Sequence, residues 1–220
     1  MNIVCEIKEP GTVSYADGLA LQAQCAARVK QGELAGALIL LQHTPVYTVG
    51  RAGAWENILI SPDQLKQKGI DVQETNRGGN VTYHGPGQIV GYPILNLALW
   101  EKDVHAYMRN LEEVMIRTLK NLGVEAGRKP EYPGVWVGNR KIAAVGVAVK
   151  NWVTMHGFSF QITKESLANF CYINPCGITE YDVVALEEFI VDITVDEVAI
   201  LLKRAFTSVF KCKLHLKEED

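Results

Sequence analysis

Several features are missing from this sequence, and each absence argues against a class of protein. No apolar run reaches the roughly 18 residues that a membrane-spanning helix needs. Lys and Arg number 22 against 25 for Asp and Glu, so the formal charge of −3 lacks the basic excess of a dedicated nucleic-acid binder. The opening MNIVCEIKEP has no basic stretch followed by an apolar core, so we expect no secretory signal. These absences predict a cytoplasmic protein that acts on neither membranes nor nucleic acids.

Cysteine pairs are missing as well. The five cysteines are an odd number, are widely spaced and include no CxxC pair, which argues against a disulfide framework and a zinc ribbon. The histidines show no HxxxH or other metal-ligand spacing, so we expect no bound metal. A thiol without a structural partner remains available for chemistry.

The sequence does have the composition of an ordinary globular protein. Hydrophobic residues make up 48% and charged residues 21% of the 220 positions, which is enough apolar material for a full core. No internal repeat, low-complexity tract or Pro/Ser-rich linker marks a boundary. We therefore expect residues 1–220 to form a single domain.

Capping residues and apolar periodicity predict four helices. The clearest covers 103–122, where apolar residues recur at three- and four-residue intervals. A capping box in TVDE (194–197) begins another helix that continues to about 210. The other two are expected over 15–31 and in the short segment 61–69.

Extended segments rich in Val and Ile separate these helices. They cover 36–41, 69–72, 88–97, 134–137, 141–149 and 155–162. The turns VGNRK and VKNW join the last three segments, which predicts antiparallel hairpins there. Because regular βαβ alternation is absent, the sequence predicts an α+β fold in which a sheet is combined with helices.

A glycine-rich stretch, RGGNVTYHGPGQ (77–88), needs a physical explanation. Ordered glycine costs roughly 0.5–1 kcal/mol of conformational entropy relative to alanine, so four glycines this close together must serve some use. Either the chain turns through positive φ in a tight hairpin, or another group approaches the main chain closely. The segment alone leaves both interpretations open.

Cys176 differs from the other cysteines because its surroundings, YINPCGIT, are turn sequence. Pro175 fixes a bend and Gly177 leaves the next peptide N–H approachable, which suits an acyl-transfer nucleophile. A buried structural role is the alternative. The remaining cysteines lie in patterns typical of helices and strands and are expected to be structural: Cys5, Cys25, Cys171 and Cys212.

A nucleophilic thiol needs a base or a positive neighbour. A thiol with an ordinary pKa of about 8.5 is only a few per cent ionised at neutral pH. The candidates for this role are His84, His156 and Lys141, although a lysine at the start of a strand is usually only solvated. The other histidines, expected to be structural or on the surface, are His43, His105 and His215.

Four segments together are specific enough to indicate a family. RGGNVTYHGPGQIVGYPI, GVWVGNRKIAAVGV, TMHGFSFQI and INPCGI occur in an order that resembles the octanoyltransferases of lipoate biosynthesis, also called lipoyl(octanoyl) transferases. The resemblance covers about 40–180. It implies the fold of the biotin and lipoate protein ligase catalytic domain, a mixed and largely antiparallel sheet flanked by helices.

The resemblance also implies an activity. Members of this family transfer an octanoyl group from the phosphopantetheine thioester of acyl carrier protein to one lysine of a lipoyl domain, through an acyl-enzyme thioester. The implied acceptors are the lipoyl domains of 2-oxoacid dehydrogenase complexes and the glycine cleavage H protein. The enzyme itself is expected to bind no cofactor.

By the same resemblance, Cys176 is the nucleophile, and Lys141 lowers its pKa and shuttles protons. The implied substrate-binding wall consists of Arg77, Gly78, Gly79, Asn80, Val81, Thr82, Tyr83, His84, Ala144, Val145, Gly146, Gly157, Phe158 and Ser159. Gly85 and Gly87 are expected to help clear a path for the acyl chain. Burying about six methylenes at about 0.8 kcal/mol each contributes roughly 5 kcal/mol, enough to select chain length.

Two other functions remain open at this stage. A lipoate protein ligase on the same fold would activate a free acid with ATP and would need no cysteine. A noncatalytic protein would bind acyl chains or carrier domains without transferring anything.

Overall fold

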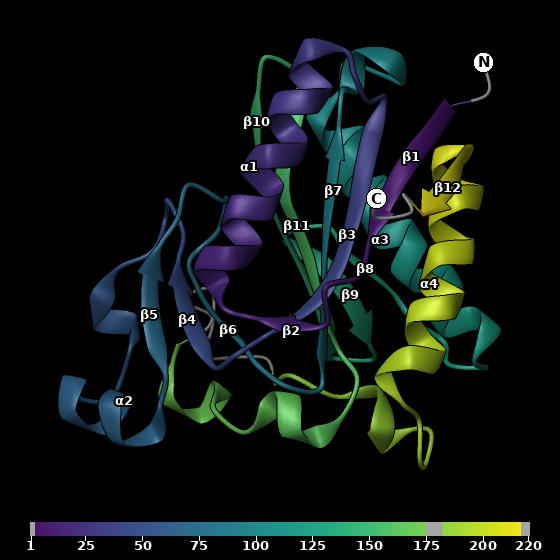
Figure 1. Ribbon diagram of the computed structural model, residues 1–220. Coiled ribbons are helices and arrows are strands. Elements are labelled where there is room, and N and C mark those ends of the chain that lie inside the picture. Colours follow the sequence, from purple (N-terminus) through teal and green to yellow (C-terminus); the bar gives the residue numbers. More distant parts are fainter. Residues whose placement is uncertain (1–2, 175–181, 217–220) are drawn as a thin grey trace.

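The computed structural model describes residues 3–174 and 182–216 of this chain. Within these ranges a nine-stranded sheet forms the centre of the molecule (Figure 1). Along the sheet the order is β12, β1, β3, β7, β11, β10, β9 and β8, with β2 paired to the end of β3. The strands are β1 (Ile3–Lys8), β2 (Thr12–Val13), β3 (Gly36–His43), β7 (Gln88–Leu95), β8 (Gly127–Lys129), β9 (Tyr132–Val137), β10 (Arg140–Lys150), β11 (Val153–Gln161) and β12 (Cys212–Leu216).

The helices begin where capping residues satisfy their first N–H groups. Ser14, Asp103 and Thr194 accept backbone hydrogen bonds at the starts of three of them, and Pro62 occupies the first turn of the fourth. The helices are α1 (Tyr15–Gln31), α2 (Pro62–Lys68), α3 (Val104–Asn121) and α4 (Val195–Phe210). Among the described residues, none of the helices combines the length and apolar composition that a membrane crossing requires.

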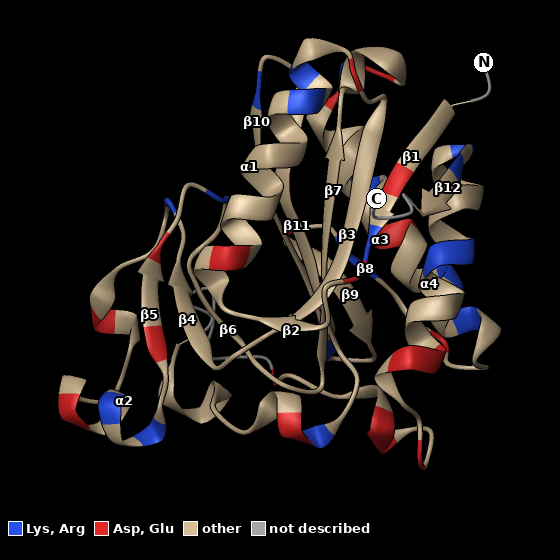
Figure 2. Ribbon diagram, in the orientation of Figure 1, with Lys and Arg blue, Asp and Glu red and all other residues tan. Residues whose placement is uncertain are grey.

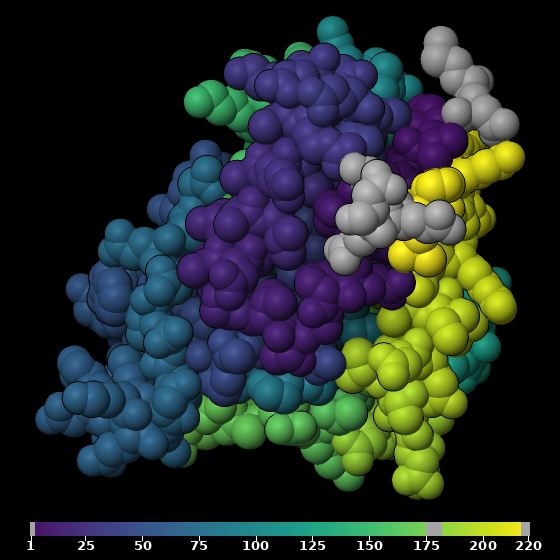
Figure 3. Space-filling model, viewed as in Figure 1, coloured from purple at the N-terminus to yellow at the C-terminus, as the bar shows by residue number. Residues whose placement is uncertain are grey.

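Helices cover both faces of the sheet. Strand β3 is buried throughout most of its length, and its side chains alternate between the two faces. Leu38 and Leu40 belong to the core shared with α3 and α4, whereas Ile39 and Leu41 pack with Val29 of α1. The pairing of β1 with β12 brings the N-terminal segment beside the C-terminal one, as the purple and yellow surfaces of Figure 3 show.

A smaller sheet in the described residues stands beside the main one. Its strands are β4 (Val46–Val49), β5 (Asp71–Glu74) and β6 (Val81–His84), in the order β5, β4, β6. Tyr47 and Tyr83 from this sheet pack with Phe170 in a separate apolar core. The small sheet thereby holds the glycine-rich segment against the edge of the main sheet.

The α+β prediction is confirmed, and so are the helix positions and the β9–β10 and β10–β11 hairpins. The predicted strand at 69–72 is wrong in its boundaries. Gly69 ends α2 with a left-handed φ of 63°, so the strand cannot begin until Asp71. Six strands of the described chain were not predicted: β2, β4, β6, β8 and the terminal strands β1 and β12. Strand β1 pairs in parallel with β12 on one side and with β3 on the other, which makes the sheet mixed.

The expectation for the cysteines is confirmed at three positions and wrong at one. Cys5, Cys25 and Cys212 are buried, whereas Cys171 is exposed in a short 3₁₀ turn at Phe170–Tyr172. Charged residues of both signs are interspersed along the described elements (Figure 2), in keeping with the small net charge.

A buried carboxylate ties α3 to β9. Glu112 is 1% exposed, its Oε1 accepts the Gly134 N–H at 2.9 Å, and its Oε2 accepts bonds from Arg109 and Arg128 at 2.9 and 3.0 Å. The neighbouring Glu113 pairs with Arg117 and Arg128 at the surface, where its side chain is 30% exposed.

We expect Glu112→Ala to lower the free energy of unfolding by about 2 kcal/mol or more, because it leaves the buried Gly134 N–H without its acceptor and removes two charge-assisted hydrogen bonds from arginine. Glu113→Ala is the matched control and should cost less than about 1 kcal/mol, because solvent screens its ion pairs. Urea denaturation of both variants measures the difference. Equal losses would contradict this account of Glu112.

Candidate active site

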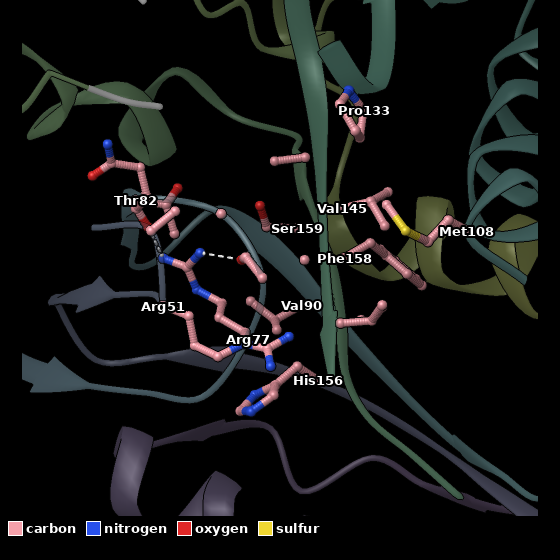
Figure 4. Close-up of a pocket in the computed structure, with 18 of the residues that line it drawn as sticks. Arg51, Arg77, Thr82, Val90, Met108, Pro133, Val145, His156, Phe158 and Ser159 are labelled. Atoms are coloured by element: carbon pink, nitrogen blue, oxygen red, sulfur yellow. Dashed lines mark hydrogen bonds between the residues drawn. The ribbon is translucent and has the colours of Figure 1, made fainter. Parts of the chain in front are cut away.

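A cavity of about 730 Å³ lies where the glycine-rich segment meets β10 and β11 (Figure 4). Its wall includes nearly all of the site residues expected from the sequence. These are Arg77, Gly78, Gly79, Asn80, Val81, Thr82, His84, Lys141, Ala144, Val145, Gly146, Gly157, Phe158 and Ser159.

The glycine-rich segment is held in place by the side chain of Arg77, which is 9% exposed. Its guanidinium donates to the Thr48 carbonyl at 2.7 Å and to the Thr48 hydroxyl at 2.9 and 3.1 Å. It also donates to the carbonyls of Gly78 and Asn80 at 2.9 and 2.7 Å. One planar donor group therefore fixes both ends of the tight turn at 77–80 and fastens it to β4.

Glycines let this turn approach β10 closely. The Gly78 N–H donates to the Val147 carbonyl at 3.0 Å, and a Cβ on Gly146 would lie 2.9 Å from the Gly78 carbonyl oxygen. Gly79 has a φ of 87°, in the region that side chains disfavour. Both uses of glycine that the sequence left open, a positive-φ turn and close approach to main chain, are therefore present.

Three expectations for this segment need correction. Tyr83 does not line the cavity: strand alternation on β6 turns Thr82 and His84 toward the cavity and Tyr83 toward the small core. A Cβ on Gly85 would clash with the Tyr83 ring, and one on Gly87 with Thr163. These two glycines therefore serve packing and do not clear a path for an acyl chain.

Burial keeps the two candidate histidines neutral. The His84 Nδ1 lies 2.6 Å from Gln88 Oε1, and burial lowers the pKa of this ring to about 3. Burial, assisted by the Arg77 charge, lowers the pKa of His156 to about 4. Neither ring carries a charge at pH 7, so neither can be the positive neighbour of a thiolate.

Lys141 lies at the start of β10 and contributes to the cavity wall. Its Nζ donates to the Pro133 carbonyl at 3.2 Å and lies 5.0 Å from the centre of the Trp136 ring. Its backbone N–H donates to the Asp182 carbonyl at 2.9 Å, and its backbone carbonyl accepts from the Val184 N–H at 2.9 Å. The chain that follows residue 181 therefore runs alongside Lys141.

Cys176 and its neighbours at 175–181 lie outside the described residues. The described chain on the N-terminal side ends at Asn174, whose N–H donates to the Asn57 carbonyl at 2.8 Å. The Asn57 side chain in turn donates to Asn80 Oδ1 at 3.0 Å. One described end of this segment is thus linked through Asn57 to Asn80, and the other pairs directly with Lys141. Asn80 and Lys141 both line the cavity.

Sequence reasoning missed much of the remaining wall. Tyr15 of α1 and Met108 of α3 follow ordinary helical periodicity, and Tyr92 sits in an apolar strand, so no local signal marks them as cavity residues. Arg51 follows a strand and carried no signal either. His156 also lines the wall, although the sequence indicates it only as a candidate base or positive neighbour of the thiol. The rest of the unpredicted wall consists of Tyr15, Arg51, Ala52, Val90, Tyr92, Val104, Met108, Glu131, Tyr132, Pro133 and Val147.

Comparison with known proteins identifies a family. The family described as Lipoyl protein ligase A/B catalytic domain matches residues 14–207. An octanoyltransferase of Clostridium kluyveri is 45% identical over 216 residues, which cover 98% of this chain and 92% of that protein.

Solved structures show the same fold at lower identity. A lipoate-protein ligase A bound with ATP superposes with a TM-score of 0.80 at 18% identity, over 100% of this chain and 90% of that one. The ligase of a bipartite lipoate protein ligase and E2 lipoyl domain system from Thermoplasma acidophilum gives a TM-score of 0.72 at 18% identity, over 100% and 87%. The family match and the identity to the Clostridium enzyme go further than fold: the chain belongs to the lipoyl protein ligase A/B catalytic domain family and, within it, to the octanoyltransferases.

Proposed function

We propose that the protein moves an octanoyl group from octanoyl-acyl carrier protein to one lysine of a lipoyl domain, through a thioester on Cys176. The observation that carries the proposal is that Lys141 and the glycine-rich turn line one cavity. The described chain on either side of the Cys176 segment is hydrogen-bonded to Lys141 and, through Asn57, to Asn80 of that turn. Asn174 stands two residues before Cys176, a link of about 7 Å at full extension.

The first half of the reaction loads the enzyme. The Cys176 thiolate attacks the carbonyl carbon of the octanoyl thioester and forms a new C–S bond. The bond from that carbon to the phosphopantetheine sulfur then breaks, and the Lys141 ammonium gives the departing sulfur a proton. The Gly78 N–H already donates to Val147, so other N–H groups must stabilise the oxyanion.

In the second half of the reaction the octanoyl group passes from the enzyme to the acceptor lysine. The neutral amine of the acceptor lysine attacks the acyl-enzyme and forms the amide C–N bond. Cys176 leaves as a thiolate, and the proton lost by the amine returns to Lys141. Each proton that Lys141 gives is thereby recovered within one cycle, and neither ATP nor a bound cofactor is consumed.

The composition of the cavity wall suits an acyl chain, and the described cysteines are in the reduced state that a thiol nucleophile requires. Small or apolar residues such as Ala144, Val145 and Gly146 leave room for methylenes, and each buried methylene contributes about 0.8 kcal/mol. The described cysteines are all free, which is consistent with action in the reducing cytoplasm.

Both substrates of the proposed reaction are carried on proteins. The donor would be acyl carrier protein, and the acceptors would be lipoyl domains of 2-oxoacid dehydrogenase complexes and the glycine cleavage H protein. The Thermoplasma ligase of the same fold was studied with an E2 lipoyl domain, which supports an acceptor of this kind.

An ATP-dependent ligase is the alternative on this fold. The structural likeness to an ATP-bound ligase, at 18% identity, concerns the fold alone. The relatives at 45% identity and above carry the name octanoyltransferase and do not favour the ligase reading.

The first test asks whether the Cys176 thiol carries the octanoyl group. Incubated with octanoyl-acyl carrier protein and no ATP, the wild type should gain one octanoyl group by intact-mass spectrometry, while Cys176→Ser should gain none and lose transfer by about a hundredfold or more. Cys171→Ser is the matched control, because it removes an exposed thiol five residues away. Adducts on Cys171, or ATP-dependent transfer retained by Cys176→Ser, would overturn the proposal.

A second test isolates the charge of Lys141. Lys141→Gln should move the midpoint of Cys176 alkylation by iodoacetamide to higher pH, because the thiolate loses a nearby cation. Arg140→Gln is the control: Arg140 is the adjacent cation on β10, but its side chain pairs with Glu188 at 2.6 Å. The proposed role of Lys141 fails if the two alkylation profiles match.

A further inference from the structure

The cavity has an end remote from Lys141. Figure 4 shows Pro133, the residue whose carbonyl accepts from the Lys141 side chain, at one end of the cavity and His156 at the opposite end. His156 belongs to β11 and is 2% exposed. An acyl chain that starts beside Lys141 and fills the cavity would run toward this ring.

The backbone of His156 is held in an unfavourable conformation. Its φ of 58° lies in the left-handed region, which residues with a Cβ rarely adopt inside a strand. Its N–H donates at 2.7 Å to the side-chain oxygen of Gln22, a fully buried residue of α1. Such a conformation persists only where the surrounding structure imposes it, and it is often found at functional positions.

The ring of His156 is held as firmly as its backbone. Its Nε2 lies 2.7 Å from Asn76 Oδ1 and 3.4 Å from the hydroxyl of Thr75, which also accepts from Tyr15 at 3.1 Å. The Tyr92 ring meets it edge to face with centres 6.3 Å apart. The ring therefore forms a rigid wall across the cavity, with little freedom to swing aside.

Another cavity, of about 400 Å³, lies next to the acyl cavity, and we call it the outer cavity. It shares Arg51 with the first cavity and is bounded by Asn76, the residue that holds the His156 ring. Met155 and Ala148, which pair across β11 and β10 next to the Val147–His156 pair, also line it. Much of its wall is apolar: Ala26, Ala27, Ala148, Val149, Val153 and Met155.

We propose that His156, positioned by Asn76, is the end stop of the acyl cavity and limits the length of the chain that the enzyme accepts. The inference rests on the proposed octanoyl transfer for the identity of the chain. We expect removal of the ring to open the acyl cavity toward Asn76 and Met155 of the outer cavity, which would then accept additional methylenes.

Two single variants and one double variant test this end stop. His156→Gly removes the ring, and glycine accepts the positive φ without strain. Asn76→Ala removes the hydrogen bond that holds the ring at an exposed position, where folding should be unaffected. Adding Ala148→Leu to His156→Gly refills the outer cavity. Asn57→Ala, the same amide deletion at a residue that is not part of the described wall of either cavity, is the matched control.

The readout is the affinity for octanoic and dodecanoic acids by titration calorimetry, followed by the rates of transfer from the two thioesters. We expect His156→Gly to raise the ratio of dodecanoyl to octanoyl affinity at least about tenfold, because steric rejection of added methylenes is lost. Asn76→Ala should move the ratio in the same direction, Ala148→Leu should reverse it, and Asn57→Ala should leave it unchanged.

Two results would overturn the end stop: unchanged ratios in folded His156→Gly and Asn76→Ala, or a ratio that Ala148→Leu fails to lower. Failure of the proposed function is separable from these outcomes. If the wild type transfers neither acyl group while the acids still bind with the expected length preference, the transfer proposal falls and the end stop is supported.

Discussion

The close approach of the turn at 77–80 to strand β10 is the constraint on which the site depends. Glycine stands at position 146 because a Cβ there would lie 2.9 Å from the Gly78 carbonyl oxygen, and a Cβ at position 50 would clash with the Gly79 carbonyl oxygen. Arg77 stabilises the approach by donating to carbonyls on both sides of the turn and to Thr48 on the next strand. A cavity wall made largely of main chain follows from this contact.

Burial sets the charge state of the two histidines in the cavity wall. Around His84 and His156 burial disfavours the charged form, so these rings act as neutral donors that fill space and hold geometry. Lys141 also lies in this wall, where its backbone pairs with the chain at 182–184. The cationic side chains of the described wall are therefore Lys141, Arg51 and Arg77, and the imidazole rings between them are uncharged.

Much of this protein could be predicted from local sequence. The caps at Ser14, Asp103 and Thr194 and the hairpins between β9, β10 and β11 follow from short-range hydrogen bonding and turn chemistry, which depend on residues a few positions apart. The motifs around Arg77, Lys141 and 155–162 indicated both the family and most of the cavity wall. The error at Tyr83 came from treating a segment as loop when its second half is a strand, whose alternation turns that ring away.

The sequence by itself determined the local structure and the set of chemical groups, because capping, turn formation and side-chain chemistry are properties of neighbouring residues. Only the tertiary structure decided which groups meet. Nothing local links Asn174 to Asn57, Lys141 to Asp182, or His156 to Asn76 and Gln22. These pairs are separated by tens of residues or more, and they come together because burying both faces of one twisted sheet leaves a single arrangement for the segments at its edge.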